Sequence, residues 1–197
     1  IDENRNVLFD FGGKTETVEE EVLESIIAGF EFACKAGPLC GEPMKHVKAN
    51  LMDFQLSEDL GLRGSTEIMR GVGKAVFGAF LTASPVLLEP VYKATISVPI
   101  ELSSKCQRIV SSRRGEISTF KQKSQLAFIE AFVPVAESSG LSQDLRSATS
   151  GRAFWQSVLD HWEKMPEKLA STVIGEIRKR KGLPSGIPKA ETFLEGN

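Results

Sequence analysis

The sequence has few of the residues on which catalysis and metal binding usually depend. It contains 2 histidines and 3 cysteines among 197 residues. Cys34, Cys40 and Cys106 form neither a CxxC pair nor a metal-ligand spacing, and their odd number argues against a disulfide framework and for the reducing cytoplasm. His46 and His161 also lack partners at a zinc-binding spacing, so we interpret them as structural or exposed. We therefore expect no metal site.

Other absences narrow the class of protein further. No apolar run approaches the roughly 20 residues that cross a bilayer, and no segment resembles a signal peptide. The formal net charge of −2 excludes a strongly basic nucleic-acid binder and leaves only local basic clusters. There is no GxxxxGK[ST] phosphate loop and no GxGxxG motif after a strand. We expect neither an independent enzyme nor a membrane protein.

The first part of the chain alternates between strand and helix patterns. Two short segments show a strand pattern, and the longer segments that follow them place apolar residues at helical spacing. Thr17 followed by Glu20 is a capping-box pattern for the first helix. Gly71 and Gly73 lie within the second helix, where we expect them to allow close packing. The predicted elements are strands at 6–10 and 47–52 and helices at 18–36 and 65–84.

A second alternating pattern begins at Leu88. Its order is β-α-β-β-α-β, which is typical of a ferredoxin-like domain. Gly140 is expected to be an irregularity in the second of its helices, and Pro166 introduces one more amphipathic helix after the last strand. The predicted elements are strands at 92–98, 116–121, 126–133 and 153–160, and helices at 100–112, 136–149 and 166–181.

A polar, glycine-containing loop at 53–66 joins a predicted strand to a predicted helix. Ser65 or Thr66 is placed to cap that helix, and Glu67 is placed to meet the partial positive charge of its first turn. Because both flanking elements are anchored in a core, the loop is expected to project as a recognition tip.

Two basic clusters each allow two interpretations. Arg113 and Arg114 precede Gly115 and form either a solvated turn or a phosphate-gripping pair. The cluster at 178–181 lies in a last helical turn, where the helix dipole alone favours cations. The residues leave both alternatives open.

Motifs along nearly the whole chain resemble, in the same order, the C-terminal part of archaeal and eukaryotic elongation factor 2. They include a Gly-Pro-Leu-Cys-Gly-Glu-Pro segment, the projecting loop, and a Leu-Arg-Ser-Ala-Thr-Ser-Gly-Arg-Ala-Phe segment. The motifs lie at residues 37–43, 53–66, 79–85, 88–90, 112–115, 134–138, 145–154 and 178–184.

This resemblance implies an α+β chain of two domains. Residues 1–87 and 166–197 would form a domain IV of the ribosomal-protein-S5 type, and residues 88–165 a ferredoxin-like domain V. GTP and Mg would belong to a G domain outside this chain. The implied partner of the cytoplasmic, monomeric protein is the ribosome: tRNA and mRNA in the decoding site for domain IV, and the large-subunit GTPase-associated centre for domain V.

The resemblance also implies which residues touch RNA. Leu62 stands where the family has the histidine that is modified to diphthamide, so this tip cannot carry the modification; Ser57 stands where many members have another histidine. The chain therefore resembles either a translocating factor that lacks the modification or a non-translocating paralogue that acts in assembly, recycling or stress. The implied tip residues are Asp59, Leu60, Gly61, Leu62, Arg63 and Gly64, and the implied rRNA contacts are Arg113, Arg114, Arg178, Lys179, Arg180 and Lys181.

Overall fold

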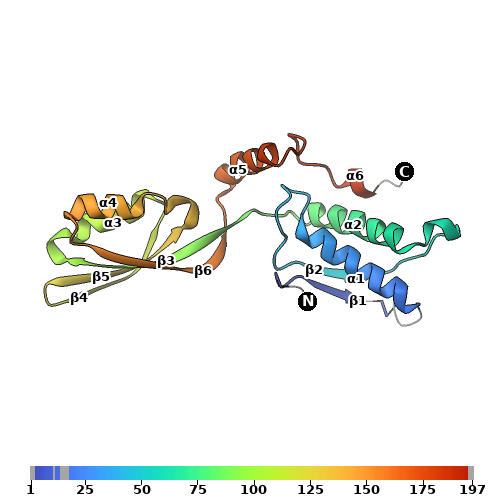
Figure 1. Cartoon of the computed structure of the whole chain (residues 1–197), viewed down its shortest axis with the longest axis horizontal. Coiled ribbons are helices and arrows are strands. Elements are labelled where there is room, and N and C mark those ends of the chain that lie inside the picture. The colour runs from blue at the N-terminus through green and yellow to red at the C-terminus, as the bar shows by residue number, and fades with distance from the viewer. Residues whose placement is uncertain (1–2, 11, 14–17, 195–197) are drawn as a thin grey trace. The chain divides into compact units, whose positions relative to one another are not determined.

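A computed structural model describes residues 3–10, 12–13 and 18–194, and the chain divides into two compact units. Unit 1 comprises Ile1–Pro85 and Glu167–Asn197, and unit 2 comprises Val86–Pro166. The boundaries predicted from the sequence lie within two residues of these divisions. Figure 1 shows a separate sheet in each unit, with helices along one side of it.

Unit 1 begins with a strand, a helix and a second strand, and the two strands form a small parallel sheet. The chain leaves β1 (Val7–Asp10), crosses over through α1 (Glu20–Lys35) and returns in β2 (Lys48–Leu51). The two strands are parallel, with Val7 opposite Lys48, as a helical crossover requires. α2 (Ser65–Thr82) then packs beside α1. The core is centred on Phe30, Cys34 and Met44, against which Leu8, Val47, Ala49, Val72, Val76 and Phe80 pack.

The helices α1 and α2 approach closely at a glycine. A Cβ at Gly29 would lie 2.9 Å from Met69 Cα, so only glycine fits at this crossing without a backbone shift. The packing role expected for Gly71 and Gly73 is wrong, because a Cβ at either would meet no atom within 4 Å. The close contact therefore uses a glycine on the other helix.

Unit 2 is a four-stranded antiparallel sheet with two helices on one face (Figure 1). The strand order is β4-β5-β3-β6. This order and the β-α-β-β-α-β sequence of elements make a ferredoxin-like fold, which confirms the predicted α+β class. The elements are β3 (Leu88–Pro99), α3 (Ser103–Ser112), β4 (Glu116–Lys123), β5 (Leu126–Pro134), α4 (Leu141–Thr149) and β6 (Phe154–Lys164).

The core of unit 2 lies between the sheet and these helices. Ile96, Ile129 and Cys106 are each 0% exposed, and a fully buried Ile contributes about 1.5–3 kcal/mol to stability. Burial raises the pKa of the Cys106 thiol, and burial also raises the pKa of Cys40 in unit 1. Thiols in such surroundings stay protonated and pack as small apolar groups.

Several predicted boundaries need correction. The predicted helix 136–149 begins only at Leu141, because Gly140 adopts a left-handed φ of +75° and separates α4 from a short 3-10 turn at Val135–Glu137. The N-cap of α2 is Gly64 rather than Ser65 or Thr66. Thr17, the predicted cap of α1, lies outside the described residues. The remaining helices are α5 (Glu167–Arg180) and α6 (Glu191–Leu194), both in unit 1.

Candidate nucleic-acid interface

The loop between β2 and α2 is exposed along its tip. Asp59, Gly61, Arg63 and Gly64 are all exposed, and Leu62 has 54% of its surface accessible. Leu60 begins a short 3-10 turn, η2 (Leu60–Leu62), within the loop. We refer to residues 57–64 as the tip loop.

The tip loop is held by hydrogen bonds between its own residues. The Asp59 N–H donates to Ser57 Oγ at 3.2 Å, and Asp59 Oδ1 accepts from the Gly61 N–H at 2.9 Å. The Leu62 N–H donates to the Asp59 carbonyl oxygen at 3.0 Å. The Nε–H of Arg63 donates to the Ser57 carbonyl oxygen and joins the two ends of the loop. Three backbone N–H groups of the loop, those of Asp59, Gly61 and Leu62, therefore have acceptors within it, and the Leu62 side chain is exposed.

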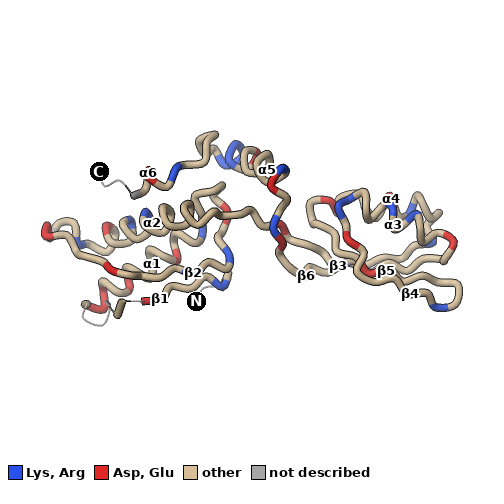
Figure 2. Tube along the Cα trace, turned by 180° about the vertical axis from the view of Figure 1, so that it is seen from behind, with Lys and Arg blue, Asp and Glu red and all other residues tan. Residues whose placement is uncertain are grey.

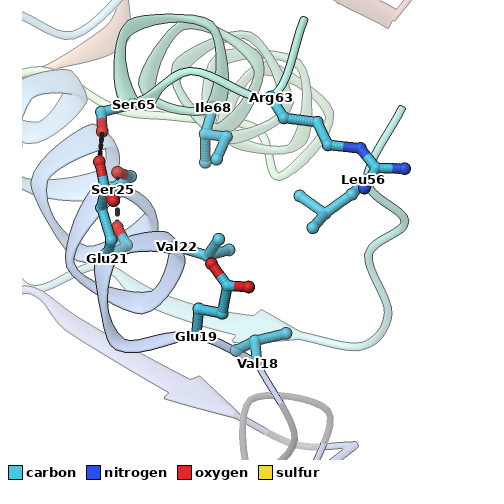
Figure 3. A pocket seen from close by; sticks show the side chains of 9 residues that line it. All are labelled: Val18, Glu19, Glu21, Val22, Ser25, Leu56, Arg63, Ser65 and Ile68. Atoms are coloured by element: carbon cyan, nitrogen blue, oxygen red, sulfur yellow. Dashed lines mark hydrogen bonds between the residues drawn. The ribbon is translucent and has the colours of Figure 1, made fainter. Parts of the chain in front are cut away.

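A pocket of about 280 Å³ lies behind the tip loop, between the first turns of α1 and α2 (Figure 3). Arg63 extends from one side of it toward Leu56, and Glu19 and Glu21 belong to the opposite side, at the start of α1. The volume is slightly below the range of about 300–1,000 Å³ typical of small-molecule sites. The pocket also includes Val18, Val22, Ser25, Ser65 and Ile68.

Ser65 connects the loop to the rest of unit 1. Its hydroxyl, which the sequence predicts to cap α2, instead donates to Glu21 Oε1 at 3.2 Å (Figure 3). Glu21 lies in the first turn of α1, so this bond ties the start of α2 to the start of α1. The sequence separation of 44 residues explains why local patterns give no signal for it.

The two arginines of the 113–114 turn form hydrogen bonds and ion pairs with other residues of unit 2. Arg114 makes two hydrogen bonds of 2.8 Å with the carboxylate of Glu89, and its Nε–H donates to Glu137 Oε1 at 3.0 Å. These carboxylates raise the pKa of Arg114, which stays charged. Arg113 donates to the Glu137 and Ser139 carbonyl oxygens at 2.6 Å each and pairs with Asp144. The sequence analysis did not predict these carboxylate partners of the two arginines.

The basic cluster at 178–181 separates into two buried or paired side chains and two exposed ones. Arg178 is 4% exposed, and its guanidinium donates to the carbonyl oxygens of Pro38, Leu39 and Pro184. Lys181 forms an ion pair with Glu42 and also donates to the Gly41 carbonyl oxygen. Lys179 and Arg180 are exposed.

The predicted RNA-contacting residues are divided between the two units: the tip loop and the 178–181 cluster belong to unit 1, and Arg113 and Arg114 belong to unit 2. Figure 2 shows acidic and basic residues interspersed in both units. rRNA binding through Arg113, Arg114, Arg178 or Lys181 stays a prediction, and it would require these side chains to exchange intramolecular partners for phosphates. Lys179, Arg180 and the tip residues Asp59, Leu62 and Arg63 are exposed. Arg114 and Lys181 are exposed as well, but each forms an ion pair within its own unit.

The histidines do not form a chemical centre. His46 is exposed, and His161 Nδ1 lies 2.7 Å from Asp160 Oδ2 while its ring packs edge-on against Phe132. Over residues 3–10, 12–13 and 18–194, no group of three or more His, Cys, Asp and Glu side chains could hold a metal ion. No helix in the described ranges has the length and apolar character to cross a membrane.

Comparison with known proteins matches both units. The model of elongation factor G domain IV matches residues 2–84, and the model of the elongation factor G C-terminus matches residues 86–173. The chain thus belongs to the translation elongation factors of this family, and it carries domain IV and the C-terminal domain.

The curated relatives that the chain resembles are elongation factor 2 proteins. The chain is 41% identical to elongation factor 2 of Korarchaeum cryptofilum over 177 residues, which are 89% of this chain and 24% of that protein. It is 39% identical to elongation factor 2 of Saccharolobus solfataricus over 194 residues, 98% of this chain and 26% of that protein. The chain is 41% identical to elongation factor 2 of Sulfurisphaera tokodaii over 196 residues, which are 98% of this chain and 26% of that protein. The chain spans about a quarter of the length of these relatives.

Proposed function

We propose that this chain is the ribosome-contacting part of an elongation factor 2-like translational GTPase, and that its tip loop reaches the decoding site and supports the movement of tRNA and mRNA. The observation that carries the proposal is an exposed loop, closed by its own hydrogen bonds, on a packed α/β base. A preformed loop of this kind reduces the ordering cost of binding. This protein acts in the cytoplasm as a monomer.

The chemistry of GTP hydrolysis lies elsewhere in the proposed protein. The relatives are about four times as long as this chain, and we place GTP and Mg in a G domain outside these residues. Unit 2 contacts the large-subunit GTPase-associated centre. The chain itself acts by binding and shape, not by making or breaking a bond.

A second function is favoured by Leu62. An exposed leucine replaces the modifiable histidine that the family resemblance implies at this position. An apolar tip has lost the polar ring that would hydrogen-bond RNA, which points to a changed partner at the tip. The alternative is a paralogue that binds the ribosome in assembly, recycling or stress without promoting translocation.

Ribosome binding is the first test. The 197-residue chain should co-sediment with purified archaeal ribosomes, and binding should weaken as salt rises because part of it is electrostatic. Asp59→Ala should weaken it, whereas Lys105→Ala, an exposed change on α3 of unit 2, serves as a surface-charge control. If the Asp59→Ala variant bound ribosomes as tightly as the unchanged chain, the tip loop would not be part of the interface.

A translocation assay then separates the two functions. The longer protein that contains this chain should move tRNA and mRNA in a GTP-dependent way on purified ribosomes, and a tip variant should reduce the rate. Ribosome binding without GTP-dependent movement would favour the paralogue. Absence of ribosome binding would reject both functions.

A further inference from the structure

Arg63 uses a particular part of its guanidinium inside the tip loop. The donor is the Nε–H, and the acceptor is the carbonyl oxygen of Ser57, six residues earlier. The bond therefore connects the first residue of the loop to the residue that precedes the N-cap of α2. An arginine that served only to contact phosphate would not need its Nε–H to bind its own backbone.

Asp59 makes two further hydrogen bonds within the loop. The carboxylate of Asp59 accepts the Gly61 N–H, and the Asp59 carbonyl oxygen accepts the Leu62 N–H. The space at the end of the loop is open, because a Cβ at Gly64 would meet no atom within 4 Å. The closed loop presents the 54% exposed side chain of Leu62 between the exposed Asp59 and Arg63.

We propose that Arg63 is a positioning residue that closes the tip loop through its Nε–H and so presents Leu62 to RNA, and that its charge is not the contact. This inference rests on the proposed function. The RNA surface that fits an isolated aliphatic side chain is the apolar face of a base or a ribose, not a phosphate oxygen. Arg63 thus acts by lowering the cost of ordering the loop on binding.

Substitution of Arg63 by glutamine or methionine distinguishes the effect of its hydrogen-bond donor from the effect of its charge. Gln carries a nitrogen at the same bond position as the Nε of Arg, so Arg63→Gln keeps a donor to the Ser57 carbonyl oxygen and removes the charge. Arg63→Met has a similar length and removes both. Lys74→Met, an exposed change on α2, controls for loss of one surface charge.

Hydrogen exchange of the free chain tests the closure. Arg63→Met should speed exchange of the Gly61 and Leu62 amides by about fivefold, which corresponds to loss of one hydrogen bond, whereas Arg63→Gln and Lys74→Met should leave it within about twofold. Equal protection in the Arg63→Met variant and the unchanged chain would overturn the inference.

Affinity for purified archaeal ribosomes tests the role in binding. Arg63→Gln should bind within about twofold of the unchanged chain, and Arg63→Met about fivefold more weakly. Leu62→Ala should weaken binding without changing the exchange of the loop amides. If Arg63→Gln bound as weakly as Arg63→Met, the charge would be the contact and the inference would fall. If exchange changed as expected while no variant altered binding, Arg63 would still close the loop, and the proposed function of the tip would fall instead.

Discussion

Two of the three Arg-Gly pairs in this chain, those outside helices, have the same sequence but make different contacts. Arg63-Gly64 and Arg114-Gly115 both lie in turns, and both were predicted to meet RNA. The side-chain acceptors of Arg114 are Glu89 and Glu137, which are 25 and 23 residues away. The acceptor of Arg63 is a backbone carbonyl six residues away.

The difference lies in what each arginine joins. Arg114 connects the end of α3 to β3 and to the turn before α4, so its turn is part of the framework of unit 2. It holds a left-handed φ of +55°, a conformation that costs free energy at a residue other than glycine and that the ion pairs offset. Arg63 joins two ends of one loop. The turn at Arg114, which pairs with residues distant in sequence, therefore stabilises the fold. The tip loop at Arg63, whose hydrogen bonds stay within the loop, is available to a ligand.

The largest effect expected from this comparison follows from Arg114→Met. The Glu89 side chain is 7% exposed, so removal of its partner leaves a nearly buried carboxylate uncompensated. We expect the free energy of unfolding of unit 2 to fall by about 3 kcal/mol. Both tryptophans, Trp155 and Trp162, belong to unit 2, so denaturant unfolding followed by tryptophan fluorescence measures it. Arg108→Met on the exposed side of α3 is the control, and similar losses in the two variants would contradict the comparison.

Arg178→Met extends the comparison to the second basic cluster. Three backbone carbonyl oxygens would lose their donor in a site where the side chain is 4% exposed. We expect a loss of about 2 kcal/mol in unit 1, measured as faster hydrogen exchange in α5 and in residues 37–41. Lys179→Met should change hydrogen exchange neither in α5 nor in residues 37–41. Equal behaviour of the two variants would mean that Arg178 does not clamp α5 to this loop.

Substitution of the glycines in the two pairs should change stability by a smaller amount, and by different amounts at the two positions. A Cβ at Gly115 would lie 2.6 Å from Val110 Cγ1 and 2.7 Å from the Val110 carbonyl oxygen, whereas a Cβ at Gly64 would meet nothing within 4 Å. Gly115→Ala should therefore cost about 1–2 kcal/mol, and Gly64→Ala, a change at an N-cap, a few tenths to about 0.5 kcal/mol. Thermal unfolding of the two variants measures both. A larger loss for Gly64→Ala would show that the tip loop is the more tightly packed turn.

Sequence patterns were sufficient for the architecture because each element carries its own signal. In unit 2, alternation along β3 and β5 reflects the single covered face of the sheet, and Val98, Ala127 and Ile129 are buried as that alternation requires. The strand order could not be predicted from periodicity, since it depends on pairings between distant segments such as β3 with β6. It followed from the ferredoxin-like order of the elements and from the family resemblance.

The candidate site shows the same division between local and distant contacts. The exposure of the tip loop follows from its polar, glycine-containing composition, which was visible in the sequence. Pairing of Arg114 with Glu89, and of Ser65 with Glu21, joins residues that lie more than 20 positions apart. Such contacts leave no periodic trace, so a single sequence does not distinguish an arginine held in an intramolecular ion pair from one that binds phosphate.

Asp59 should have the smallest effect on stability and the clearest local effect. Asp59→Ala removes the acceptor of the Gly61 N–H, whereas Asp59→Asn keeps an oxygen at the same position. Because Asp59 is exposed and its bonds stay within the loop, we expect the free energy of unfolding of unit 1 to change by less than about 0.5 kcal/mol in either variant. The Gly61 amide should nevertheless exchange faster in Asp59→Ala than in Asp59→Asn, as mass spectrometry of the tip peptide would measure. If Asp59→Ala instead destabilised unit 1 as strongly as Arg114→Met destabilises unit 2, the tip loop would be part of the framework, and the two Arg-Gly turns would differ only in position.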